Sequence, residues 1–163
     1  VSAVMYGGNA ELINRFFETL DPEFDLHLIH VTPGTRGAAF EIRGAIEKGH
    51  FVAILADRVG PDGSGGHPVE FLGSTALFPR GPFELATLIG CPVMLASARR
   101  VGDARYRVDS EPLYAGGRVP RGERDERVGE LVVRYARYLE RKCLASPYQW
   151  FNFFEFWSED QTR

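Results

Sequence analysis

The chain contains 163 residues, of which 44% are hydrophobic and 25% are charged, and its formal net charge is −3. A chain of this length and composition suits one globular domain that buries a core of its own. The slight acidic excess gives no reason to expect nucleic acid as a partner. We therefore predict a single domain over residues 1–163, with no nucleic-acid interface.

The cysteines and the pattern at the N-terminus bear on cofactors, on membrane spans and on whether the chain is a fragment. Cys91 and Cys143 lie in no C-x-x-C motif and at no metal-ligand spacing from the four histidines, which favours reduced thiols and no metal or other cofactor. The sequence has no signal-peptide pattern and no apolar run of about 18 residues, the length that spans a bilayer. It begins in a strand-like segment without methionine, so we expect a fragment of a larger domain.

Strand and helix patterns alternate through the first third of the chain. Residues 1–6 are strand-like, apolar spacing over residues 12–20 predicts a helix, and residues 25–31 alternate as a strand. Residues 37–48 predict an amphipathic helix that ends at Gly49, and residues 51–56 an apolar, buried strand. This order is typical of parallel strands joined by right-handed crossovers. The predicted fold class is α/β, with a mostly parallel central sheet flanked by helices.

Charge follows the apolar strand at Asp57 and Arg58. Because ligands of open α/β sheets bind outside the carboxyl ends of strands, this pair is the first candidate for a site, with a structural ion pair as the alternative. The glycine-rich segment 59–67 matches neither a dinucleotide fingerprint nor a phosphate loop. A nucleotide-handling domain is therefore the weakest of the functions considered.

Prolines frame the next candidate segment, residues 78–82, which follows an extended segment at residues 69–73. Pro82 suits the first turn of a helix that continues to Gly90. The backbone N–H groups at such a helix start can face an anionic oxygen, and an ordinary loop-to-helix entry is the alternative.

The second half of the chain predicts a hairpin, a long helix and an aromatic tail. Residues 91–98 resemble a buried strand, and Gly102-Asp103 divides two extended runs that carry Arg99, Arg100, Arg105 and Arg107. These arginines suit either a phosphate or carrier-protein contact or a solvated tip. A linker at 114–124 precedes a covering helix over residues 125–144. The aromatic tail, residues 147–157, suits core closure, an acyl-chain pocket or a bilayer interface.

Five segments, in this order, resemble the lysophospholipid-acyltransferase-like superfamily, nearest to bacterial lipid A late acyltransferases and predicted glycolipid acyltransferases. They are residues 49–58 (GHFVAILADR), 69–73 (VEFLG), 78–82 (FPRGP), 91–95 (CPVML) and 148–157 (YQWFNFFEFW). The resemblance implies transfer of a fatty acyl group from an acyl carrier protein or CoA thioester to a hydroxyl of a lipid or glycolipid acceptor. It also implies a peripheral position at the cytoplasmic face of the inner membrane.

The family's catalytic motif, His-x4-Asp/Glu, is missing from these residues. In that motif the histidine takes the proton of the acceptor hydroxyl and the carboxylate orients the imidazole. The fifth residues after the four histidines are Thr32, Thr35, Leu55 and Leu72. In the family the motif precedes a strand like residues 1–6. The resemblance therefore implies a catalytic histidine upstream of residue 1 and no catalytic residue, and no activity, in this chain alone.

The substrate-binding residues implied by the resemblance are Asp57, Arg58, Gly73, Phe78, Pro79, Arg80 and Gly81. Arg58 would grip an anionic headgroup or a carrier phosphate through its fork of donors. Residues 78–82 would shape the pocket around the thioester, with Gly81 allowing close backbone approach. Arg80 stands where family members often carry a carboxylate. We expect Arg58 and Gly81 to border one cavity; the alternative is a catalytically incomplete α/β module that binds acyl chains or a partner.

Overall fold

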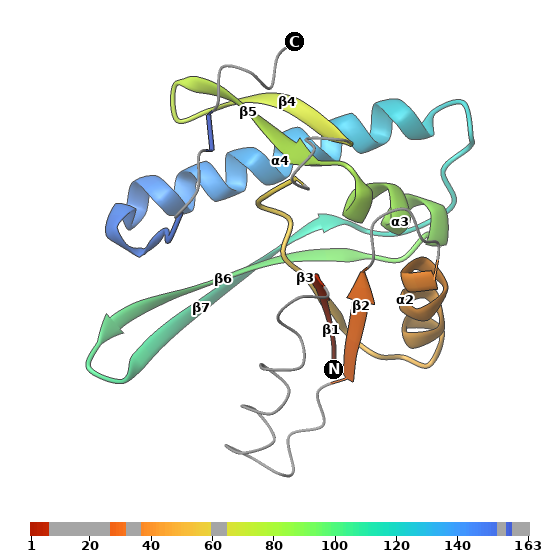
Figure 1. The fold of residues 1–163 in the computed structure, drawn as a ribbon, viewed down its shortest axis with the longest axis horizontal. Coiled ribbons are helices and arrows are strands. Elements are labelled where there is room, and N and C mark those ends of the chain that lie inside the picture. The colour runs from red at the N-terminus through yellow and green to blue at the C-terminus, as the bar shows by residue number, and fades with distance from the viewer. Residues whose placement is uncertain (7–26, 32–36, 60–64, 153–155, 158–163) are drawn as a thin grey trace. The chain divides into compact units, whose positions relative to one another are not determined.

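The computed structural model describes residues 1–6, 27–31, 37–59, 65–152 and 156–157 (Figure 1). The helix predicted at 12–20 and most of the glycine-rich segment lie outside the described residues. The chain divides into two compact units, Val1–Leu55 and Ala56–Arg163, and each is described by itself. The single domain stays a prediction.

The first unit holds a parallel sheet. Its strands are β1 (Ser2–Tyr6), β2 (His27–Val31) and β3 (Val52–Ile54), in the order β2-β1-β3. Both β2 and β3 pair with β1 in parallel, from Ser2 opposite His27 and from Ser2 opposite Val52. The predicted parallel pairing of these three strands is confirmed.

Helix α2 (Gly37–Glu47) links β2 to β3 and buries the small apolar side of its surface, Ala38, Ile42 and Ala45. It ends as the sequence predicts. Gly49 adopts a positive φ of 81°, and the N–H groups of Gly49 and His50 donate to carbonyls of the last helical turn.

The structure corrects the prediction that residues 51–56 form a buried strand. The strand is shorter than predicted, and the flanking Phe51 and Leu55 are 82% and 83% exposed. An all-apolar run predicts a strand covered on both faces. In the described sheet, however, β3 is an edge strand, which leaves one side without a neighbour.

The described residues of the second unit form two antiparallel hairpins, two α-helices and one short 3₁₀ helix. The first hairpin joins β4 (Gly66–Phe71) to β5 (Ser74–Pro79), and α3 (Gly81–Ile89) follows directly. The second joins β6 (Val93–Gly102) to β7 (Arg105–Tyr114) and turns where Gly102-Asp103 predicts. Helix α4 (Arg124–Ala145) and the short 3₁₀ helix η1 (Pro147–Gln149) complete the unit (Figure 1).

The β4–β5 hairpin was not predicted. Its two-residue turn consists of Leu72 and Gly73, with φ values of 52° and 86°. A turn with two positive φ values favours Asn-Gly or Asp-Gly, so a leucine at its first position hides the turn in the sequence. Glu140 of α4 offsets this by accepting the Leu72 N–H at 2.7 Å.

Aromatic side chains form the centre of the second unit. Phe71 and Phe78 are fully buried, with ring centroids 5.2 Å apart. Helix α4 packs on them with an apolar face that includes Val128, Leu131, Val132 and Ala136. The rings of Trp150, Phe156 and Trp157 lie 5.5, 5.4 and 6.3 Å from that of Phe71. Core closure is confirmed for these three residues, whereas Tyr148 and Phe151 of the described tail are 95% and 68% exposed.

Strand β6 departs from its prediction as a buried strand. Leu95 is buried, whereas Met94 on the other face is 57% exposed. The reason is that, among the described residues, β6 pairs only with β7 in a two-stranded ribbon, and Met94 lies on a face that they leave exposed.

Taken together, the described residues mix helices and strands as an α/β chain, with one parallel sheet of three strands and two antiparallel hairpins. No helix among them is long and apolar enough to cross a bilayer.

Replacing Phe71 with alanine tests the aromatic core. We expect Phe71→Ala to lower the free energy of unfolding by about 3–5 kcal/mol, because the ring contacts both the hairpin and the tail and leaves a cavity. Denaturant titration followed by tryptophan fluorescence measures it. Tyr148→Ala is the control, since that side chain is 95% exposed, and it should change stability by less than about 0.5 kcal/mol. Equal effects of the two variants would contradict this account.

Candidate functional site

Asp57 and Arg58 form a two-point ion pair directly after the first unit. The Arg58 Nη2 donates to Asp57 Oδ2 at 3.0 Å and Nε donates to Oδ1 at 3.4 Å. The Arg58 side chain is 53% exposed and that of Asp57 is 22% exposed. The hydrogen bond to Asp57 raises the pKa of Arg58, and partial burial opposes that rise. Asp57 therefore holds a charged guanidinium that still faces solvent over half of its surface.

Tyr135 of α4 lies close enough to this pair for the charges of Asp57 and Arg58 to act on its phenol, and it was not predicted as a site residue. Its ring packs against Phe78 and Phe83, with centroid distances of 5.9 and 5.7 Å. Burial raises the pKa of the Tyr135 phenol, and the negative charge of Asp57 raises it further. The phenol therefore stays neutral at physiological pH. In the sequence Tyr135 falls on the apolar face of the helix, a pattern that signals packing alone.

Arg80 lies in a network at the end of β5. Its guanidinium pairs with Glu84 at 3.1 Å and with Asp125 of α4, and approaches His67 Nδ1 at 3.4 Å. The side chain is only 19% exposed. Asp125 stands in the first turn of α4, where a carboxylate also offsets the positive helix end. Arg80 thus fastens the β5–α3 junction to the start of α4.

Pro79 and Gly81 flank Arg80. Pro79 is the last residue of β5 and pairs with Gly66 across the hairpin, and Gly81 begins α3. A methyl group added at Gly81 would have no described atom within 4 Å, apart from its chain neighbours and the nearby backbone of α3. The space beside Gly81 is therefore open, as close approach of a substrate requires.

The seven predicted residues fall into separate places. Asp57 and Arg58 lie beside Tyr135, whereas the Arg80 partner Asp125 lies ten residues, about 15 Å, away along α4. Gly73 sits at the opposite end of β5 from Arg80, about 20 Å distant. Phe78 is fully buried in the core, where its ring packs edge-to-face against that of Tyr135. Tyr135 contacts Phe78 and feels the charge of Asp57, but the structure does not gather all seven residues in one place.

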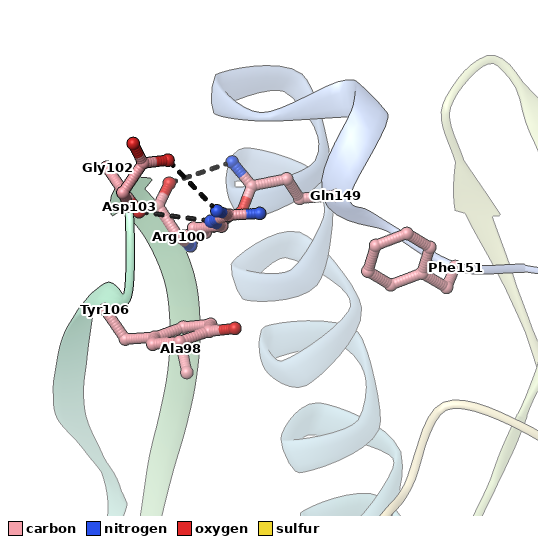
Figure 2. Close-up of a pocket in the computed structure, with 7 residues that line it drawn as sticks. All are labelled: Ala98, Arg100, Gly102, Asp103, Tyr106, Gln149 and Phe151. Carbon is pink, nitrogen blue, oxygen red and sulfur yellow. Dashed lines mark hydrogen bonds and ion pairs between the residues drawn. The ribbon is translucent and has the colours of Figure 1, made fainter.

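A cavity of about 610 Å³ lies elsewhere in the second unit, between the β6–β7 ribbon and the chain after α4 (Figure 2). It is lined by Ala98, Arg100, Gly102, Asp103, Tyr106, Gln149 and Phe151. None of the seven predicted residues lines it, so the shared cavity at Arg58 and Gly81 stays a prediction. Among the described residues, no group of three histidines, cysteines or carboxylates could hold a metal ion.

Comparison with known proteins gives no further assignment. No protein-family model matches the chain, and no curated protein sequence matches it.

Replacing Arg80 tests whether this residue stabilises the fold or serves only to bind substrate. We expect Arg80→Ala to lower the free energy of unfolding by about 1–2 kcal/mol, because it removes charged hydrogen bonds that join two elements. Arg127→Ala is the control: its pair with Glu130 is exposed on α4 itself and should contribute less than about 0.5 kcal/mol. Thermal and denaturant unfolding measure both. An Arg80→Ala protein as stable as the parent would show that this network does not fasten the junction.

The buried thiol of Cys143 predicts a pH dependence of stability. Burial, with the charge of Glu140, raises the pKa of Cys143 from 9.0 to about 11. Between these values the folded chain binds more protons than the unfolded chain, so stability falls as pH rises from 9 to 11. Denaturant titrations across this range should show a shallower fall in Cys143→Ala. A parallel fall in both proteins would exclude Cys143 as a source of the pH dependence.

Proposed function

We propose that this chain is the substrate-binding portion of an acyltransferase, which moves a fatty acyl group from an acyl carrier protein or CoA thioester to a hydroxyl of a lipid or glycolipid. The ordered resemblance of five segments motivates the proposal. The finer fold, a mostly parallel central sheet flanked by helices with a hairpin addition, belongs to it. So does a peripheral position at the cytoplasmic face of the inner membrane.

The observation that carries the proposal is the Asp57–Arg58 pair beside Tyr135. Asp57 fixes the guanidinium by two hydrogen bonds while half of the side chain stays exposed. Planar donors held in this way suit a phosphate oxygen of a headgroup or of a carrier's prosthetic arm. Tyr135, Phe78 and Phe83 form an aromatic group behind the pair. Phe78 and Phe83 are buried, so the half-buried Tyr135 is the member of this group that an amphiphilic acceptor would contact next to the charge.

Each group has a defined part in the proposed reaction. The acceptor hydroxyl oxygen forms a bond to the thioester carbonyl carbon, the carbon–sulfur bond breaks, and the thiolate leaves. Arg58 binds the anionic part of the acceptor or carrier, and Asp57 keeps the guanidinium oriented. The proton of the hydroxyl goes to a general base. None of the four histidines here has an acid at the motif spacing, so the proposed base is a histidine outside these 163 residues.

The assay uses the complete protein with a labelled acyl carrier protein thioester or acyl-CoA and a lipid extract as acceptor. Background is set by a variant in which the histidine of the complete protein's His-x4-Asp/Glu motif is replaced by alanine. Acyl transfer above this background supports the proposal. Saturable binding of fatty acid or vesicles without any transfer would instead favour the catalytically incomplete binding module, and saturable nucleotide binding alone would overturn both.

Arg58 is the residue to vary within that assay. We expect Arg58→Ala to raise the KM for the acceptor or carrier by about tenfold to a hundredfold, the loss of a charged hydrogen bond. Arg58→Lys should restore part of it, because a lysine keeps the charge but not the fork. The control is Arg43→Ala, which breaks a similarly exposed pair with Glu47. A large loss of stability in Arg58→Ala with unchanged kinetics would assign the pair a purely structural role.

A further inference from the structure

The far half of the β6–β7 ribbon concentrates positive charge. Residues 99–107 contain four arginines and one aspartate, a net charge of +3, in a chain whose net charge is −3. The two strands pair so that Arg99 lies directly opposite Arg107 and Arg100 opposite Tyr106. Like charges directly opposite each other in a hairpin destabilise it. An anion that bridges Arg99 and Arg107 would remove this repulsion.

Most of this charge is not compensated within the described residues. Arg100 donates to the Gly102 carbonyl at 3.1 Å and pairs with Asp103 at 3.3 Å. By contrast, Arg99, Arg105 and Arg107 form no ion pair with any residue that the structure describes. Nearer the base of the ribbon the pattern reverses, because Asp109 and Glu111 are paired with Lys142 and Arg141 of α4. The uncompensated charge is therefore confined to the far half.

Apolar side chains share this half of the ribbon. Along β7, Arg105, Tyr106, Arg107 and Val108 alternate and all four are exposed, with Tyr106 at 68% and Val108 at 69%. Alternation places the two arginines on one face and the two apolar side chains on the other. Arginine next to exposed aromatic and aliphatic side chains is the composition of segments that lie at membrane interfaces.

Among the described residues of the second unit, no further strand pairs with either outer edge of the ribbon. On the β6 side, the Gln149 side chain accepts the Arg100 N–H at 2.7 Å and donates to the Arg100 carbonyl at 3.1 Å (Figure 2). Gln149 thus covers the edge of β6 at that point. The edge of β7, with its alternating arginines and apolar residues, is the one that a flat surface can approach.

We propose that residues 99–108, the far half of the β6–β7 ribbon, dock on an anionic lipid bilayer along the β7 edge. The arginines would contact lipid phosphates. Val108 and the exposed part of Tyr106, whose ring also lines the cavity of Figure 2, would reach the headgroup region. An acidic protein would also pair with the arginines. A bilayer is favoured because the arginines lie on one face of β7 and the apolar side chains lie on the other. A bilayer that the β7 edge enters would contact both faces, whereas a protein surface would cover only one of them. The inference rests on the membrane position in the proposed function and names the surface responsible.

Vesicle sedimentation of the full 163-residue chain tests this without any enzymatic turnover. One set of vesicles is phosphatidylcholine alone, and the other contains about one third phosphatidylglycerol. We expect partition into the anionic set, weakened by salt. Arg105→Gln/Arg107→Gln should reduce the partition coefficient by about thirtyfold, since each arginine near an anionic surface contributes roughly 1 kcal/mol. Arg105→Lys/Arg107→Lys should retain most of the binding.

Matched variants separate this surface from charge in general. Arg118→Gln/Arg121→Gln changes the net charge equally, at exposed residues of the linker before α4, and should leave partition nearly unchanged. Tyr106→Ser should weaken binding to the anionic vesicles, and circular dichroism verifies that each variant is folded. Equal losses in both arginine pairs, or absence of anionic-vesicle binding, would overturn the proposal. Binding to an acidic carrier protein without vesicle binding would also overturn it, while leaving the proposed acyl transfer to its own assay.

Discussion

The second unit depends on the packing of aromatic rings around Phe71. This ring is fully buried and contacts Phe78 from the same hairpin and three rings from the tail. Because α4 packs on the same rings, one cluster joins segments that are far apart in the sequence. Two of these contacts are edge-to-face, one is tilted and one is stacked, and edge-to-face and offset-stacked pairs stabilise beyond the area that they bury. The tail also bonds back directly, since Trp157 Nε1 donates to the Phe71 carbonyl at 3.1 Å.

This packing also determines what the candidate site consists of. Tyr135 belongs at once to the core, through Phe78 and Phe83, and to the neighbourhood of the Asp57 charge. The ion pair of Asp57 and Arg58, in the segment after β3, is therefore within electrostatic range of the buried aromatic core. Arg80, by contrast, is engaged with Glu84 and Asp125 and connects elements. Two arginines that look equivalent in the sequence have different surroundings in the structure.

Local patterns in the sequence predicted most of the described elements. The amphipathic spacing of α2 and α4, the Gly90 end of α3 and the Gly102-Asp103 turn each reflect interactions within a few residues, and each is confirmed. The β4–β5 turn escaped because Glu140, 68 residues away, stabilises a leucine in an unfavourable conformation. Burial of β3 and β6 was wrong because apolar composition does not reveal whether a strand has neighbours on both sides. The ion pair of Arg58 was predicted as an alternative, whereas Tyr135 and the partners of Arg80 require tertiary contacts that no spacing encodes.

The bonds from Gln149 to Arg100 have a consequence for solubility. An amide side chain has both donors and an acceptor, and Gln149 uses one of each to bond the backbone of β6 as a single residue of a third strand would. The unpaired edges of a two-stranded ribbon can pair with strands of identical molecules, which leads to aggregation into fibrils. By placing a glutamine after the last turn of α4, the chain interrupts such growth on one border at the expense of a single side chain.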